Sequence, residues 1–323
     1  MKLLVTGGAG YVGSQTVRHL IDSGHEVVVF DNLSLGHRHA VGSARLVVGS
    51  VCDVDALDAV FRDHAFDAVL HFAALTLVDE SCRNPRRYYE NNVVGTLRLV
   101  DAMRANNVGN LVFSSTTAVY GTPSELPVSE DAPLAPESPY GRTKAIVEQL
   151  LRDYAAAYGL AAVCLRYFNA AGASLDGRYG EEHEPETHLI PRTLEVALGK
   201  RSELDIFGTD YPTPDGTCVR DYVHVVDLAI AHQRTLDVLR PGEVQAFNLG
   251  AGRGTSVREI VDWCRRVTGR EIRTVERPRR PGDPAAIVAD TRLAAEKLGW
   301  RPKYSDLETI VQTAWRKCCG PPL

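Results

Sequence analysis

A glycine-rich turn near the start of the chain constrains the fold more than any other feature. Gly7, Gly10 and Gly13 follow an apolar run of strand length, residues 2–6, and the apolar side chains from Val12 onward recur with helical spacing. In such a strand–turn–helix unit the first two glycines let a pyrophosphate approach the backbone closely, and the third lets helix and strand pack together. The segment therefore predicts a dinucleotide-binding unit, and a glycine-rich turn without a ligand is the alternative.

A second predicted strand, residues 26–30, ends directly before Asp31. A carboxylate at this spacing suits the 2′-hydroxyl of a ribose and repels a 2′-phosphate. No arginine follows directly, because Asn32 comes next, followed by Leu33 and Ser34. The pattern favours a bound ligand over an empty turn, and it predicts NAD rather than NADP as the cofactor.

Apolar runs alternate with helical patterns through the first half of the chain. Strands are expected at residues 45–48, 67–72, 110–114 and 162–166, and helices at residues 55–63, 84–106 and 140–158. This order predicts an α/β fold with a doubly wound parallel sheet.

The pattern of predicted elements changes after residue 168. Loops rich in Gly and Pro are expected at residues 172–187 and 208–217, and helices at residues 188–199, 225–239, 256–268 and 306–317. We therefore expect an NAD-binding Rossmann domain over residues 1–168 and a smaller α/β substrate lobe over residues 169–323, with chain crossings between them. A ligand would lie in the crevice at the carboxyl edge of the sheet.

Composition restricts the classes of function. The chain has 323 residues, 44% of them hydrophobic, and a formal net charge of −5 without clustered Lys or Arg, so nucleic acid is not an expected partner. No signal-peptide pattern precedes the glycines, and no apolar run approaches the roughly 20 residues of a membrane span, so we expect a cytoplasmic enzyme without membrane contact. The cysteines are scattered without a Cys-x-x-Cys pair, which argues against disulfides and a zinc site, so no metal is expected.

Tyr140 and Lys144 form the second informative motif, a pair one helical turn apart. Ser138 and Pro139 before them are typical of a helix start. To act as a base near pH 7, a tyrosine needs its pKa lowered by ~3 units, or ~4 kcal/mol. An ammonium about 4 Å away supplies ~4 kcal/mol at an effective dielectric constant of about 20. The pair is therefore predicted to take a proton from a hydroxyl while NAD takes the hydride, and an ordinary surface pair is the alternative.

Hydroxyl side chains follow the strand predicted at residues 110–114. Because this strand is central in the predicted sheet, its carboxyl end would lie beside the cofactor. We predict that Thr116 orients the substrate hydroxyl there. A run of hydroxyls at a strand end is otherwise ordinary turn chemistry.

The chain resembles the extended short-chain dehydrogenases/reductases and, among them, the UDP-glucose 4-epimerases. The similarity runs over essentially the whole length, and its most specific segments are residues 88–96, 113–121, 165–169, 206–224 and 278–283. It implies bound NAD, a UDP-sugar substrate and a homodimer paired through the helices at residues 84–106 and 140–158. In the implied reaction Tyr140 takes the 4-hydroxyl proton, the 4-keto sugar turns, and the hydride returns to its other face, which interconverts UDP-glucose and UDP-galactose.

The resemblance also implies roles for individual residues. The catalytic residues would be Tyr140, Lys144 and Thr116. The NAD contacts would be Gly7, Gly10, Tyr11, Val12, Gly13, Asp31, Asn32, Asp53, Val54, Phe72, Ala73, Ala74, Asn91, Ser114, Tyr140, Lys144 and Tyr167. The UDP-sugar contacts would be Thr116, Asn169, His188, Leu189, Phe207, Arg220, Tyr222, Arg280, Asp283 and Ile287.

Three positions depart from some members of the family. Thr76 stands where several have a lysine that reaches the NAD phosphates, and His188 replaces an asparagine. Ile287 stands where others carry a larger or smaller residue beside the 2-substituent of the sugar. Cofactor retention, the role of His188 and the preferred sugar therefore stay open.

Other functions also stay open. Nucleotide-sugar 4,6-dehydratases and UDP-glucuronate decarboxylases share the fold, but they place acidic residues just after the position of Thr116, where Thr117 and Ala118 stand. A non-catalytic, redox-sensing NAD-binding regulator would have no use for Tyr140 with Lys144. Among the epimerases, UDP-N-acetylglucosamine and UDP-glucuronate are competing substrates.

Overall fold

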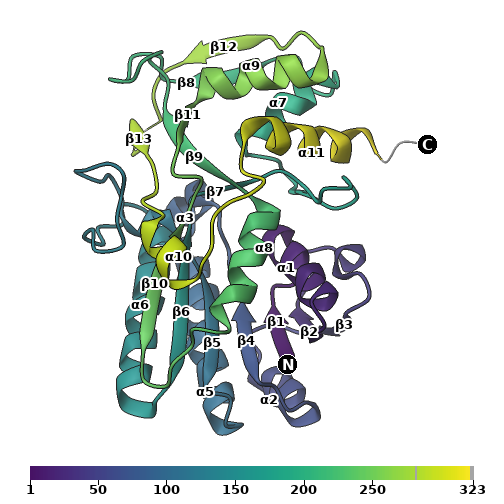
Figure 1. Ribbon diagram of the computed structural model, residues 1–323, viewed down its shortest axis with the longest axis vertical. Helices are drawn as coiled ribbons and strands as arrows, with labels where there is room; N and C mark the ends of the chain where they lie inside the picture. The colour runs from purple at the N-terminus through teal and green to yellow at the C-terminus, as the bar shows by residue number, and fades with distance from the viewer. Residues whose placement is uncertain (281, 321–323) are drawn as a thin grey trace.

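A seven-stranded sheet forms the centre of the protein (Figure 1), in a computed structural model that describes residues 1–280 and 282–320. Its strands are β1 (Lys2–Thr6), β2 (Glu26–Asp31), β3 (Arg45–Val48), β4 (Ala68–His71), β5 (Asn110–Thr116), β6 (Ala161–Tyr167) and β10 (Val244–Leu249). They lie in the order β10-β6-β5-β4-β1-β2-β3, and each neighbouring pair is parallel.

Helices cover both faces of this sheet. They are α1 (Tyr11–Asp22), α2 (Val54–Asp63), α5 (Gly95–Ala105), α6 (Pro139–Tyr158) and α8 (Val225–Thr235). α1 and α8 share a core with Leu3 and Val5 of β1, whereas α2, α5 and α6 share one with Leu4. Successive side chains of a strand point to opposite faces, so a continuous apolar run fills two cores at once. The predicted doubly wound parallel sheet is confirmed.

The start of α6 follows from its own residues. Ser138 is the N-cap, and its hydroxyl accepts a hydrogen bond from Gly141 N at 3.1 Å. Pro139 occupies the first helical position, where a missing N–H is harmless. Gly159 ends the helix with a φ of 76°, which glycine adopts readily. The cap places Tyr140 in the first turn of the helix.

The segment predicted as one helix over residues 84–106 forms three successive helical elements. α4 (Pro85–Tyr88) leads into a π-helical turn, η2 (Tyr89–Val94), and α5 follows. Within η2 the Asn92 side chain is buried, accepts from Leu75 N at 2.8 Å and donates to Leu75 O at 3.0 Å. Because the spacing of apolar residues does not reveal hydrogen bonds between a side chain and a distant backbone, the sequence predicted an uninterrupted helix. π-turns of this kind are common at functional sites.

A smaller lobe stands over the carboxyl edge of the large sheet (Figure 1). Its strands are β7 (Asn169–Ala171), β9 (Val219–His224), β11 (Gly254–Ser256) and β13 (Ala286–Ile287) in one sheet, and β8 (Leu204–Phe207) and β12 (Thr274–Arg277) in another. Its helices are α7 (Leu189–Ala197), α9 (Val257–Thr268) and α11 (Leu307–Cys319). Leu194, Ile260 and Ile310 join these helices in a separate core. Within residues 1–280 and 282–320, no helix combines the length and apolarity that crossing a membrane requires.

The predicted division at residue 169 does not follow the two lobes. α8, β10 and α10 (Arg292–Lys297) come after this residue, yet they pack with the large sheet. β10 pairs with β6 and covers an edge that would otherwise be open. The polar side chains of Gln245 and Asn248 interrupt the apolar run of β10, which is why the sequence did not indicate this strand. The chain therefore crosses between the lobes repeatedly.

A buried ion pair joins α6 to the sheet. Arg166 of β6 donates through Nε and Nη2 to the two carboxylate oxygens of Glu148 at 3.0 and 2.6 Å, and both side chains are almost fully buried. The hydroxyl of Ser115 on β5 donates to the same carboxylate at 2.7 Å. Arg166 also donates to the hydroxyl of Tyr120, which donates in turn to Asn248 of β10. The network therefore fixes α6 against three adjacent strands.

Removal of the charge from Glu148 should destabilise the protein strongly. Glu148→Gln leaves Arg166 buried without a counter-charge, so the free energy of unfolding in urea should fall by about 3–5 kcal/mol. Asp153→Asn, an exposed change on the same helix, should stay within about 0.5 kcal/mol of wild type. An equally small effect for Glu148→Gln would show that the pair is not required for the packing of α6.

Candidate functional site

The turn between β1 and α1 brings backbone segments into very close contact. A Cβ on Gly7 would lie 2.4 Å from Ala73 N, and a Cβ on Gly13 would lie 2.3 Å from Gly7 O. A Cβ on Gly10 would meet only Gly7 O, at 3.4 Å, and so would project into open space. Gly7 and Gly13 therefore serve close packing, while Gly10 keeps the turn open to a ligand.

A groove with about 550 Å³ of empty space runs along the carboxyl ends of β1, β2, β3 and β4. Its lining includes these residues predicted to contact NAD: Gly7, Gly10, Asp31, Asn32, Phe72, Ala73, Ala74 and Asn91. The Asp31 carboxylate accepts from Ala9 N at 3.0 Å and from Leu33 N at 2.8 Å, which fixes it at the groove. The groove fits a dinucleotide, with an open turn for its pyrophosphate and a carboxylate for a ribose.

The other nine predicted NAD contacts lie outside this lining, among them Asp53, Val54, Val12 and Gly13. Asp53 instead caps α2, where its carboxylate accepts from Ala56 N at 3.1 Å, and Val54 begins that helix. The groove wall there consists of residues 49–51, which the sequence did not indicate. Their place directly after β3 was the available signal, because ligands lie beyond the carboxyl ends of strands. Val12 and Gly13 pack toward the protein instead.

The predicted catalytic side chains meet at the junction of β5 and α6. Tyr140 and Thr116 are 8% and 9% exposed, and their side chains are close enough for Thr116 to influence the pKa of the phenol. Lys144 is fully enclosed one turn further along and donates from Nζ to Ser114 O at 2.7 Å. The hydroxyl of Ser81 accepts from Tyr140 N at 3.2 Å. Ser81 lies on α3 (Val78–Arg83), a short helix that the sequence did not predict.

The protein alone does not turn Tyr140 into a base. Burial raises the pKa of Tyr140 to about 12, and the neighbouring Thr116 opposes this rise only in part. Burial also lowers the pKa of Lys144 to about 7. The Lys144 ammonium points at Ser114 O and lies 4.7 Å from the centre of the Phe113 ring, not at the phenol. Contrary to the prediction from the sequence, Lys144 is therefore not among the groups that lower the pKa of Tyr140.

Tyr167 lies beside this catalytic group. Its hydroxyl makes a hydrogen bond with the His232 side chain, and burial raises its pKa, a rise that the neighbouring Ser114 opposes. Ser114 and Tyr167, both predicted to contact NAD, are therefore neighbours at the ends of β5 and β6.

A larger cleft with about 970 Å³ of empty space opens on the other side of Tyr140. Predicted substrate contacts in its lining are Asn169, Arg220, Arg280, Asp283 and Ile287. Arg220 pairs with Asp283, and the guanidinium of Arg280 lies 3.9 Å from the centre of the Phe207 ring. These contacts bring two guanidiniums to the cleft, with the Phe207 ring behind the guanidinium of Arg280.

Thr117 is a residue of this cleft that the sequence did not identify. It follows Thr116 and lines the cleft, and its Oγ1 is buried without a hydrogen-bond partner. Buried polar atoms in native proteins nearly always have a partner, so this hydroxyl has unused hydrogen-bonding capacity beside the cleft. The run of hydroxyls was the available signal, although the sequence argument used only Thr116.

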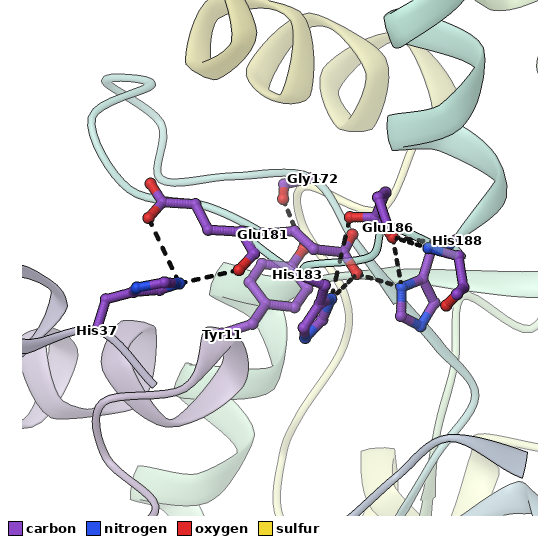
Figure 2. A network of polar contacts seen from close by, with 9 residues as sticks. Tyr11, His37, Gly172, Glu181, His183, Glu186 and His188 are labelled. Atoms are coloured by element: carbon purple, nitrogen blue, oxygen red, sulfur yellow. Dashed lines mark hydrogen bonds and ion pairs between the residues drawn. The ribbon is translucent and has the colours of Figure 1, made fainter. Parts of the chain in front are cut away.

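Three of the remaining predicted substrate contacts line a neighbouring cavity with about 570 Å³ of empty space, whereas Thr116 and Phe207 line neither the cleft nor this cavity. His188, Leu189 and Tyr222 lie there, and Asn169 lines both this cavity and the cleft. His188 is the N-cap residue of α7, and its Nδ1 lies 2.6 Å from Glu181 and 3.0 Å from Glu186 (Figure 2). Burial alone would lower the pKa of His188, but hydrogen bonds with the two carboxylates raise it to about 10.

The loop at residues 172–188 reaches back over the glycine turn. The Tyr11 hydroxyl donates to Gly172 O at 2.6 Å, and Gln15 donates to Tyr179 O at 3.2 Å. His37 Nε2 lies 2.9 Å from Glu182 O (Figure 2). Tyr11 therefore connects the two lobes at the edge of the groove.

Removal of the Lys144 ammonium should change how stability depends on pH. The folded pKa of about 7 lies below the ordinary 10.5, so the unfolded chain binds more protons between these values. The free energy of unfolding of wild type, minus that of Lys144→Met, should therefore rise from pH 7 to about 10 and stay level below pH 7. Urea unfolding of the cofactor-free proteins measures the difference, and a flat profile would show that the ammonium is not desolvated.

Comparisons with known proteins show the family of this chain. The sequence matches the GDP-mannose 4,6 dehydratase family over residues 4–313. A UDP-glucose 4-epimerase of Halalkalibacterium halodurans is 51% identical over 98% of this chain and 95% of its own length.

Two solved structures extend the likeness to the whole fold. The UDP-glucose 4-epimerase of Brucella ovis in complex with NAD is 51% identical, with a TM-score of 0.93 and coverage of 97% of both chains. That of Bifidobacterium longum in complex with NAD+ and UDP is 37% identical, with a TM-score of 0.94 and coverage of 99% of this chain and 98% of its own. The chain belongs to the UDP-glucose 4-epimerase family, a family of NAD-dependent isomerases.

Proposed function

We propose that this protein interconverts UDP-glucose and UDP-galactose by removing a hydride from C4 of the sugar and returning it to the opposite face. The observation that carries the proposal is the place of Tyr140. Its ring packs between Leu75, which lines the cofactor groove, and Ala118, which lines the substrate cleft. Its hydroxyl, beside Thr116, is thus available to a sugar that lies between the two spaces.

We propose that the nucleotide part of the UDP-sugar anchors the substrate in the cleft. Arg220 and Arg280 can fork onto a diphosphate, and Phe207 can cover the uracil ring. Thr117 offers its unpaired hydroxyl to the sugar. Because the 4-keto sugar must turn over between the two hydride transfers, most of the binding free energy must come from the nucleotide.

Proton transfer is the proposed task of Tyr140, with Thr116 holding the 4-hydroxyl beside it. When bound, NAD supplies the hydride acceptor and donor and brings positive charge to the site. Tyr140 needs this help, since burial in the protein alone keeps its pKa near 12. Lys144 stands one turn along α6 and is held by Ser114 O, so it fixes that side of the catalytic group.

Three further assignments belong to this proposal. Residues 1–168 supply most of the NAD site, and residues 169–323 most of the UDP-sugar site. The protein is a cytoplasmic homodimer that pairs through α5 and α6, and Ile146 of α6 is 41% exposed, as an apolar contact across such an interface would require. Light scattering of the purified protein measures its mass, and a monomer would contradict the pairing.

The products distinguish this function from its rivals. Purified protein incubated separately with UDP-glucose and UDP-galactose, without added cofactor, should bring both mixtures to one equilibrium ratio. A product that has lost water would instead indicate a 4,6-dehydratase, for which Asp79 and Glu137 place carboxylates in the same cleft. Protein that binds NAD but turns over neither sugar would indicate a regulator. UDP-glucuronate serves as a further substrate in the same assay.

Loss of the phenol should stop the chemistry without loss of binding. Tyr140→Phe should lower kcat by about 10²–10⁴-fold, while the Kd for UDP changes little. Tyr154→Phe is the matched control, because this tyrosine lies on the same helix and donates to Asp101 instead. Steady-state rates and UDP titrations measure both quantities. Near-normal turnover by Tyr140→Phe would remove Tyr140 as the base.

Ile287 is the proposed determinant of sugar size. It lines the cleft and is smaller than the tyrosine of some relatives, so we expect activity on UDP-N-acetylglucosamine as well as UDP-glucose. Ile287→Tyr should lower turnover of the N-acetyl sugar at least about 10-fold more than that of UDP-glucose, because the clash falls on the larger 2-substituent.

Initial rates on both sugars test the role of Ile287, and Ile287→Val serves as a control that should retain both activities. If wild type does not act on the N-acetyl sugar, or if Ile287→Tyr lowers both rates equally, specificity lies elsewhere in the second lobe.

A further inference from the structure

Four side chains of the loop at residues 172–188 converge on one point (Figure 2). They are Glu181, His183, Glu186 and His188, and their donor atoms all lie within 4.8 Å of one another. The Nδ1 atoms of His183 and His188 lie 2.9 and 2.6 Å from the same oxygen of Glu181. The same two nitrogens lie 4.0 and 3.0 Å from Glu186. Two imidazoles and two carboxylates thus enclose a common centre.

The spacing of these donors matches a small metal ion. Tetrahedral zinc bonds of about 2.0–2.2 Å to nitrogen and oxygen place neighbouring donors about 3.4 Å apart. The four nitrogen-to-oxygen distances, 2.6, 2.9, 3.0 and 4.0 Å, lie on both sides of that value. An ion could therefore enter with shifts of well under 1 Å and would replace imidazole protons.

The surroundings hold these donors in place. One oxygen of Glu186 accepts from Thr187 N and His188 N, each at 2.7 Å, which orients the carboxylate toward the centre. The Tyr11 ring lies edge-on to His183, with 6.4 Å between ring centres. His188 is half-exposed and lines the cavity beside the substrate cleft. Supporting contacts of this kind orient metal ligands in known sites.

We propose that Glu181, His183, Glu186 and His188 bind a divalent transition-metal ion of the Zn²⁺ class. Two imidazole nitrogens favour zinc over magnesium or calcium, which prefer oxygen donors. The ion pins the loop at residues 172–188 between Tyr11 of the first lobe and the start of α7 in the second. Scattered cysteines gave no sign of this site, because its ligands are histidine and glutamate with the spacing Glu-x-His-x-x-Glu-x-His.

Metal titration of the intact protein tests the proposal. After EDTA treatment and dialysis, the protein should take up about one Zn²⁺ per chain and no Mg²⁺, measured by mass spectrometry of the metal content. His183→Gln and Glu186→Gln should each weaken Zn²⁺ binding by at least about 10-fold. His39→Gln should not, although His39 lies with His37 and Glu182 in a neighbouring cluster. Circular dichroism checks that each variant is folded.

X-ray absorption by the Zn²⁺-loaded wild type tests the ligands without any substitution. Two imidazoles with oxygen donors near 2.0–2.2 Å are expected, and sulfur at about 2.3 Å would assign the ion to cysteine instead. The proposal is overturned by sulfur ligands, by no specific Zn²⁺ uptake, or by uptake that His39→Gln abolishes and His183→Gln retains. In the second of these cases the four residues are an ion-pair network whose cation is the His188 proton.

Discussion

The pair of Glu148 and Arg166 sets the position of the catalytic group. Tyr140, Lys144 and Glu148 stand on one helix at intervals of four residues, so they share a face. Glu148 is held by Arg166 of β6 and by Ser115 of β5, the residue directly before Thr116. Because a buried pair of this kind is directional and expensive to break, it fixes the rotation of α6 more firmly than apolar packing alone. The side chains of Tyr140 and Thr116 meet as a result.

Burial around this group has an electrostatic consequence. The same enclosure that excludes water raises the pKa of Tyr140 and lowers that of Lys144, so both groups favour their neutral forms in the protein alone. A cofactor that brings positive charge reverses part of this penalty. Burial and a positively charged cofactor therefore act on the pKa of Tyr140 in opposite directions.

The sequence predicted the parts of the molecule that depend on local pattern. The first strands and their helices, the glycine turn, Asp31 and the helix start at Ser138 all follow from spacing and capping. β10 was not predicted, because polar residues interrupt its apolar run and because it pairs with β6 from a distant part of the chain. The roles of Ser81 and Thr117 were not predicted for a different reason. They depend on which atoms face these side chains in the folded protein, and neither residue type nor spacing along the chain encodes these contacts.

The π-helical turn η2 makes the length of this part of the chain critical. Relative to an α-helix, a π-turn accommodates one more residue without extending the pitch, so the residues after it are rotated by about 100°. Asn91 on one side faces the cofactor groove, and Leu99 on the other faces the core. If η2 wound as regular α-helix without loss of a residue, Asn91 and Leu99 could not keep their present directions together. A relative that forms a regular α-helix here should therefore be one residue shorter between these two positions.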